Sequence, residues 1–280
     1  MSAPVPSSDA PTLAPPWPVL PAPSTWLQID FISDLHLSAS AAATFTTWQR
    51  YLQSTPADAL FILGDLFYVC VGDDAMSTSA VPNFETQCAH ILKAASTRLP
   101  IFLMHGNRDF LIGSEFSKAA GLTLLHDPTV LDFAGQRWLL SHGDALCLAD
   151  TDYLQFRAQV RSSNWQHDFL AQPLEQRQQN ALALRQQSEA HKCISAPGLD
   201  LDAQASCDWL CAAQAHALIH GHTHKPGEHI LEPGLRRIVL SDWDAAATTP
   251  RAEVLRLSIN RSGPTQSCTM QRLSLTQSLA

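Results

Sequence analysis

The turn Gly221-His222-Thr223-His224 carries two imidazoles two residues apart. It follows the apolar run 215–219, which is typical of a short buried strand. Neutral imidazole is the commonest nitrogen ligand of Zn, Mn, Fe and Ni in proteins. The turn therefore predicts a metal site if the rest of the chain supplies further ligands. Otherwise it holds two ordinary surface or core histidines.

Four more polar turns follow apolar runs and supply the missing ligand types. The seven candidate ligands on the five turns are Asp34, His36, Asp65, Asn107, His142, His222 and His224. A set of two carboxylates, one amide and four imidazoles suits Mn, Fe or Zn better than Ca or Mg. Seven ligands are too many for one tetrahedral site. They match two metal ions about 3.5–4 Å apart that share one carboxylate.

The turns are positioned by a regular alternation of strands and helices. Apolar runs predict strands over 27–32, 59–63, 100–104, 138–140, 215–219, 238–240 and 254–259, and helices over 45–52, 84–98 and 202–214. This order predicts an α/β fold with the polar residues at the carboxyl ends of strands. The polar stretch 150–192 interrupts the order and predicts two or three helices. We therefore expect residues from about 147 to 200 to form an inserted helical cap.

Composition limits the classes of protein that fit. The formal net charge is −8 and no dense basic run appears, which argues against a nucleic-acid binder or a nuclease. The seven cysteines are odd in number and scattered, so we expect free thiols in a reducing cytoplasm. Residues 1–25 hold eight prolines and no basic residue, which predicts a disordered tail without a secretory signal. We expect one domain over 26–270 and a C-terminal tail over 271–280, without a membrane span.

The five turns together resemble the calcineurin-like metallophosphoesterases over nearly all of the chain after residue 26. The resemblance implies a four-layer α/β/β/α sandwich of two mixed sheets, with a dinuclear centre at one end. It assigns one metal ion to Asp34, His36, Asp65 and His224. It assigns the other ion to Asp65, Asn107, His142 and His222. Asp65 would bridge the two ions.

Further motifs look like those of one family within this group, the UDP-2,3-diacylglucosamine hydrolases. They are Gly106-Asn107-Arg108-Asp109, Ser141-His142-Gly143-Asp144 and Tyr153-x-x-Phe156-Arg157. The resemblance implies two Mn²⁺ per chain and hydrolysis at the α-phosphorus to UMP and 2,3-diacylglucosamine 1-phosphate, a step of lipid A biosynthesis. It also implies a cytoplasmic enzyme, peripheral on the inner membrane. No obligate protein partner is evident, and no nucleic acid is expected.

Several residues are expected to contact the substrate. Arg108, next to the ligand Asn107, would hold phosphoryl oxygens with two parallel donors, and His222 completes the catalytic set. A surface ion pair between Arg108 and Asp109 is the structural alternative. The resemblance also places Asp150, Ser188 and Lys192 beside the substrate, although Asp150 also fits a helix N-cap and Ser188 a solvated helix position. His105 and His220 are expected to brace the ligand loops.

The sequence departs from the family pattern at three places, all outside the predicted ligands. Tyr68, Val69 and Cys70 replace a usual Glu and Trp, Ser241 replaces a usual Gly, and residues 193–195 lack a usual basic residue. These departures affect predicted substrate contacts only. Two other functions stay open, namely a related phosphoesterase for a soluble nucleotide or phosphodiester and a non-catalytic scaffold. The complete ligand set disfavours the scaffold, and the apolar and basic cap favours a lipid substrate.

Overall fold

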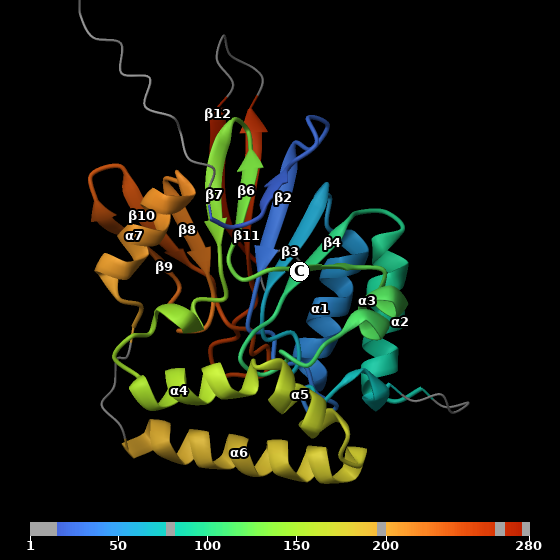
Figure 1. Ribbon diagram of the computed structural model, residues 1–280. Coiled ribbons are helices and arrows are strands. Elements are labelled where there is room, and N and C mark those ends of the chain that lie inside the picture. The colour runs from blue at the N-terminus through green and yellow to red at the C-terminus, as the bar shows by residue number, and fades with distance from the viewer. Residues whose placement is uncertain (1–15, 77–81, 195–199, 261–266, 276–280) are drawn as a thin grey trace, which may run out of the picture.

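The computed structural model describes residues 16–76, 82–194, 200–260 and 267–275 (Figure 1). Of residues 185–194 it describes the helical backbone but not the side chains. Most of the regular elements belong to two six-stranded sheets. One sheet contains β1 (Val19–Pro21), β6 (Thr129–Phe133), β7 (Gln136–Leu140), β8 (Ala217–His220), β10 (Leu235–Val239) and β9 (Gly227–Glu232), in that order. The other contains β12 (Ser267–Ser274), β11 (Glu253–Asn260), β2 (Gln28–Ile32), β3 (Ala59–Leu63), β4 (Ile101–Met104) and β5 (Thr123–Leu125).

Both sheets are mixed. Strands β2, β3, β4 and β5 run parallel, while β11 joins β2 and β12 antiparallel. In the first sheet β7, β8 and β10 run parallel, and β9 and β6 are antiparallel to their neighbours β10 and β7. Parallel strands end at the same edge of a sheet, so the loops after β2, β3, β4, β7 and β8 meet at one end of the molecule.

The alternation of side chains along the strands builds the layers. In β3, Phe61 and Leu63 point between the sheets and pack with residues of the first sheet such as Ile219. Leu60 and Ile62 point outward and pack against α1 (Ala42–Ser54), α2 (Phe84–Ser96) and α3 (Ser114–Ala120). The outer face of the first sheet is covered by α7 (Ala203–Ala213). The predicted α/β/β/α sandwich of two mixed sheets is therefore confirmed.

Three helices lie across the end of the sandwich where the ligand loops meet (Figure 1). They are α4 (Thr151–Val160), α5 (Ser163–Leu170) and α6 (Leu174–Ile194), within the stretch expected to form a cap. Phe169 of α5 packs with Val71 and Leu111 of the core. The buried Arg177 of α6 pairs with Asp74 and donates to the Val71 carbonyl. Within the described ranges, no helix combines the length and the apolar character that a membrane crossing needs.

Both predicted tails overlap edge strands. The disordered tail expected over 1–25 is wrong for its last part, because β1 pairs parallel with β6 and Trp17 packs on Trp209, with ring centroids 5.1 Å apart. Residues 1–15 lie outside the described part of the chain. The C-terminal tail expected over 271–280 is wrong up to Ser274, since β12 pairs along its whole length with β11. Residues 276–280 are not described.

Strands β5, β6 and β9 and helix α3 were also not predicted from the sequence, while the predicted elements appear with boundaries shifted by a few residues. Two of the missed strands, β5 and β9, lie at sheet edges, as β1 and β12 do. Edge strands bury only part of their surface and so carry a weak periodic signal. Two three-residue helical turns, Asp73–Ala75 and Asp144–Leu146, complete the described elements.

Candidate metal centre

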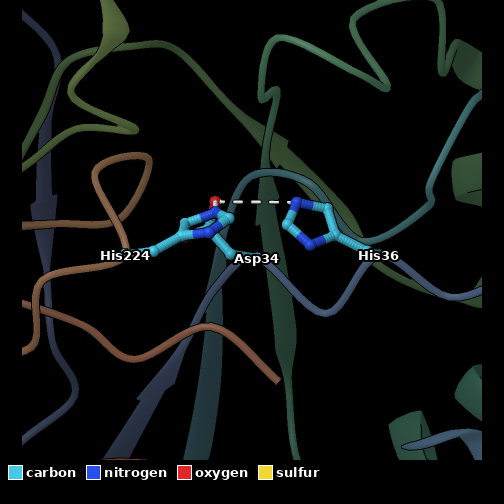
Figure 2. Close-up of side chains that lie close together, drawn as sticks. All are labelled: Asp34, His36 and His224. Atoms are coloured by element: carbon cyan, nitrogen blue, oxygen red, sulfur yellow. Dashed lines mark hydrogen bonds and ion pairs between the residues drawn. The ribbon is translucent and has the colours of Figure 1, made fainter. Parts of the chain in front are cut away.

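Asp34 lies between two imidazoles from different parts of the chain (Figure 2). Its Oδ1 is 3.2 Å from Nε2 of His224 and 4.0 Å from Nε2 of His36. One potential ligand atom from each of the three residues lies within 4.8 Å of the others. Asp34 and His36 come from the loop after β2, and His224 comes from the loop after β8. This group could hold one metal ion.

A second group shares Asp34 with the first. Asp34, Asp65 and His142 also place ligand atoms within 4.8 Å of one another. Asp65 Oδ2 is 3.2 Å from His36 Nε2, and Asp65 Oδ1 is 3.8 Å from His142 Nε2. Asp65 therefore lies near one histidine expected at each ion, His36 and His142, which is the position that the resemblance gives to a bridging ligand.

Asn107 completes the cluster on the side of the second group. Its Oδ1 is 3.0 Å from Nε2 of His142 and 3.1 Å from Nδ1 of His222. The backbone N–H of His222 donates to Asp34 Oδ2 over 2.9 Å, which joins the two groups. The structure thus brings all seven predicted ligand residues into one cluster.

The backbone of the cluster is unusual. Five of the predicted ligands have positive φ angles between 48° and 66°, namely Asp34, His36, Asp65, His222 and His224. Residues with a Cβ seldom adopt this left-handed conformation, which costs about 1–2 kcal/mol for each residue. Such backbone strain is concentrated at functional sites, where the surrounding structure holds it in place.

Two glycines allow the loops to approach one another. A Cβ on Gly106 would lie 2.0 Å from Asp65 Oδ1, and a Cβ on Gly221 would lie 2.3 Å from Asp34 Oδ2. Both distances are far below van der Waals contact. Any other residue at these positions would therefore push a carboxylate out of the cluster.

The two carboxylates are buried but remain ionised. Burial alone would raise the pKa of Asp34, but the hydrogen bond and charge of His224 outweigh it and hold that pKa well below its usual range. Burial is likewise outweighed at Asp65 by His142, His36 and Arg108, so its pKa is also low. Two buried negative charges at this spacing repel one another unless cations lie beside them. This is the environment that a divalent metal ion stabilises.

The histidines fit the same interpretation. His142 donates from Nδ1 to the Leu63 carbonyl over 2.9 Å, which turns its Nε2 toward Asn107 and Asp65. Burial would lower the pKa of His142, but Asp65 and Asp34 outweigh it and raise that pKa to about 9, so a proton on this ring meets the negative charge of the carboxylates, a charge that a metal ion would meet in its place. Burial and the neighbouring His142 lower the pKa of His222 to about 4, which leaves it in the neutral form that binds metals. Carboxylate, amide and imidazole donors together suit Mn, Fe or Zn.

Arg108 points into this cluster. Its Nε is 3.2 Å from Asp65 Oδ2, and its side chain is 12% exposed. The alternative ion pair with Asp109 is not formed, because the Asp109 carboxylate accepts from the backbone N–H groups of Leu66 and Gly106. Burial, and then the charge of Asp65, raises the pKa of Asp109 to about 6.

Tyr68, one of the departures from the family pattern, lies beneath Arg108. The guanidinium carbon of Arg108 is 5.2 Å from the centre of the Tyr68 ring. A cation over an aromatic face is stabilised by about 0.5–1 kcal/mol at an exposed site and by more where water is excluded. The changed residue at position 68 therefore supports the orientation of Arg108.

The predicted substrate residues have different outcomes. Asp150 accepts from the backbone N–H of Tyr153 and caps α4, as its structural alternative proposed. Ser188 and Lys192 lie in α6, in the part whose side chains are outside the described residues. His105 donates from Nε2 to the Ile112 carbonyl, and His220 donates from Nδ1 to the Gly221 carbonyl. Both histidines therefore brace ligand loops.

Asp242 is a residue of this site that was not predicted from the sequence. Its Oδ2 lies 3.8 Å from Nδ1 of His224, and Arg251 holds both of its oxygens at 2.9–3.0 Å. This separation is too long for a hydrogen bond, so Asp242 acts on His224 through its charge. Burial would lower the pKa of His224, but Asp34 and then Asp242 outweigh it and raise that pKa. The sequence does contain a signal for Asp242. It comes shortly after the apolar run 238–240, just as each predicted ligand turn follows an apolar run.

Comparison of the chain with known proteins finds similar sequences and similar structures. A family model described as calcineurin-like phosphoesterase matches residues 27–226, a range that includes all seven predicted ligands. UDP-2,3-diacylglucosamine hydrolase from Cellvibrio japonicus is 42% identical over 231 residues, which are 78% of this chain and 95% of that protein. The enzyme of the same name from Ralstonia nicotianae is 42% identical over 239 residues, 81% of this chain and 88% of that protein. Among solved structures, a single-mutant Vps29 from Entamoeba histolytica covers 89% of this chain and 100% of its own, with 13% identity and a TM-score of 0.44.

Proposed function

The chain belongs to the calcineurin-like phosphoesterases and, within them, to the UDP-2,3-diacylglucosamine hydrolases, and from this membership we propose that it hydrolyses the pyrophosphate bond of UDP-2,3-diacylglucosamine in lipid A biosynthesis. Water attacks the α-phosphorus, and the products are UMP and 2,3-diacylglucosamine 1-phosphate. The observation that carries the proposal is the cluster of seven ligand-type residues with Arg108 pointing into it.

The cofactor in this proposal is two Mn²⁺ ions. Asp34, His36, Asp65 and His224 would hold one ion, and Asp65, Asn107, His142 and His222 would hold the other, with Asp65 shared. The position of Asp65 near both His36 and His142 supports the sharing. When bound, such ions polarise a phosphoryl oxygen and lower the pKa of a coordinated water toward neutrality.

Side chains around the cluster bind the substrate phosphate and stabilise the transition state. Arg108 has two nitrogens besides Nε, and they can donate in parallel to the phosphoryl oxygens. The negative charge on these oxygens increases in the transition state, so a fixed guanidinium stabilises that state more than the bound substrate. Asn107 precedes Arg108 in the chain and lies 3.1 Å from His222, and both are proposed to contact the same phosphate. Asp150, Ser188 and Lys192 are proposed to bind the glucosamine phosphate side.

The cap supplies apolar surface for the acyl chains. Phe156, Leu170, Leu182 and Leu184 of α4, α5 and α6 are between 38% and 49% exposed, which is high for large apolar side chains. Exposed apolar groups gathered on one part of a protein mark a surface for lipid or protein contact. They support a cytoplasmic enzyme that is peripheral on the inner membrane, where its lipid substrate lies.

The decisive experiment is hydrolysis of the diacyl substrate by the Mn²⁺-loaded protein in ¹⁸O-labelled water. We expect UMP to be released and to carry the label, because attack occurs at the α-phosphorus. An unacylated UDP-sugar serves as the control and should be cleaved much more slowly. Equal cleavage of both would favour the alternative of a phosphoesterase for soluble nucleotides. Label in the lipid phosphate would mean attack at the other phosphorus.

A further inference from the structure

Asp144 is a fully buried carboxylate close to the ligand cluster that the proposed reaction does not use. Its Oδ2 accepts a hydrogen bond from the Tyr153 hydroxyl over 2.5 Å and another from Arg157 Nε over 2.8 Å. Both donors belong to α4, the first helix of the cap. Asp144 itself begins the helical turn just after His142. This carboxylate therefore joins the cap to a ligand loop.

The Tyr153 ring lies against a predicted metal ligand. It stacks on the His222 imidazole with ring centroids 6.0 Å apart and planes inclined by 28°. His222 has a second ring neighbour, because His142 packs edge-on against it with centroids 5.1 Å apart. Rotation of the His222 ring would break both contacts. The plane of this imidazole is thus held between the core and the cap.

Additional bonds keep α4 in place over the cluster. Arg157 also lies 3.7 Å from Oδ2 of Asp127, whose other oxygen accepts from Ser141. Arg161, the residue that caps the C-terminus of α4, donates to the Gly106 carbonyl over 2.8 Å. Arg157 and Arg161 thus tie the helix to the loops that carry His142 and Asn107. A tyrosine on such a helix has a fixed position relative to the metal ligands.

The hydroxyl of Tyr153 is the donor in its bond to Asp144, because a carboxylate oxygen accepts. The donor, its carboxylate acceptor and the stacked ring form one continuous path from Asp144 through Tyr153 to His222. Mutation of a group that orients a metal ligand typically lowers metal affinity or activity by about 10–100-fold.

We propose that Tyr153 is a positioning residue of the metal centre, which holds the His222 imidazole in its ligating orientation while Asp144 and Arg157 fix the tyrosine. The cap thereby takes part in building the metal site, besides covering the substrate. The inference rests on the proposed metal-dependent function. It adds to that function a dependence of metal binding on a cap residue outside the seven-ligand set.

The test compares three variants of the full chain. Tyr153→Phe removes the hydroxyl bond and keeps the ring, and Tyr153→Leu removes both. Tyr51→Phe is the matched control, because the Tyr51 hydroxyl donates to the buried carboxylate of Asp30 over 2.8 Å in another part of the core. Calorimetric titration of the metal-free proteins with Mn²⁺ gives the affinity. Turnover of the diacyl substrate gives kcat, and thermal unfolding checks that each variant folds.

We expect Tyr153→Leu to lower the Mn²⁺ affinity and kcat by about 10–100-fold, with Tyr153→Phe between it and the wild type. Tyr51→Phe should change neither, although it also loses a buried hydrogen bond. Mn²⁺ affinity of Tyr153→Leu equal to that of Tyr51→Phe would overturn the proposal. If the leucine variant does not fold, Tyr153→Phe decides by the same comparison. A wild-type protein that binds Mn²⁺ but does not cleave the substrate would refute the proposed function, while calorimetry would still test the role of Tyr153.

Discussion

Replacement of Arg108 by Ala separates catalysis from metal binding at this site. The guanidinium lies 3.2 Å from Asp65 and above the Tyr68 ring, and both contacts hold it in one orientation at the edge of the cluster. It is close enough to the predicted ligands to reach a phosphate bound there. Arginine cannot itself be a metal ligand, because it stays protonated. The substitution should therefore affect the reaction and leave the ligand set complete.

The structure sets the size of the effect. Two unit charges about 4 Å apart interact by about 4 kcal/mol at an effective dielectric constant of about 20. Solvent screens the Arg108 side chain little, since only 12% of it is exposed. Loss of one preorganised donor usually lowers the rate by about 10²–10³, or about 2.7–4 kcal/mol, which agrees with the Coulomb value. We therefore expect kcat/KM to fall by about 10²–10³ in Arg108→Ala and by less in Arg108→Lys, which keeps the charge without the fork.

Arg108→Ala should not weaken metal binding and should, if anything, strengthen it. Arg108 is a positive charge beside the shared ligand Asp65, so its removal takes away repulsion toward a bound cation. Mn²⁺ affinity should be equal to or higher than that of the wild type, measured by calorimetry beside steady-state kinetics. Arg236→Ala is the control, because Arg236 also pairs with a carboxylate and lies over an aromatic ring, but at the start of β10. Near-normal activity of Arg108→Ala, or metal loss in proportion to activity, would show that Arg108 is structural.

Three further outcomes follow from the site and the fold. Chelation should abolish activity, and Mn²⁺ should restore it better than Mg²⁺, which prefers oxygen ligands; full activity of protein shown to be metal-free by elemental analysis would contradict this. Deletion of residues 1–15 should leave the melting temperature unchanged, while deletion of 1–25 should lower it by about 5–10 °C, because the β1 pairing and the Trp17 contact are lost. Burial is outweighed at Asp144 by His142 and Arg157, so its pKa is depressed, and its stabilising contribution is present above about pH 3.9 and lost as the pH falls toward the folded-state pKa. In acid titrations of unfolding, Asp144→Asn should therefore lose less stability than the wild type between pH 4 and 2, and equal slopes would refute the assignment.

The nature of the site was readable from the sequence because its signals are local. Each ligand turn follows an apolar run, so strand, turn and ligand occur within a few residues of one another, as in 59–65 and 215–224. Parallel strands bring such turns to one edge, which is a general rule of α/β folds. Ligand types, their number and the gathering of all seven at one end could therefore be predicted. The N-cap role of Asp150 was also predictable, since a cap depends only on the next three residues.

Only the tertiary structure decided how the ligands are held. Positive φ angles at Asp34 and His222 are imposed by contacts between loops, and the residue types at those positions do not predict them. The partner of Arg108 is Asp65 rather than the adjacent Asp109, because Asp109 is already occupied by two backbone donors from neighbouring loops. These outcomes depend on which loops become neighbours, which is a property of the whole sheet.

The edge strands and the cap also could not be predicted from local sequence alone. A strand as short as β1 has no periodicity to detect, and it forms because β6 offers free hydrogen-bonding groups to Ala22 and its neighbours. Tyr153 looks like an ordinary helix residue until α4 folds over the cluster and places its ring on His222. The sequence by itself determined the chemistry of the ligands, since chemistry resides in side-chain type. Orientation, strain and the contribution of the cap arise from long-range packing, and only the folded chain specifies them.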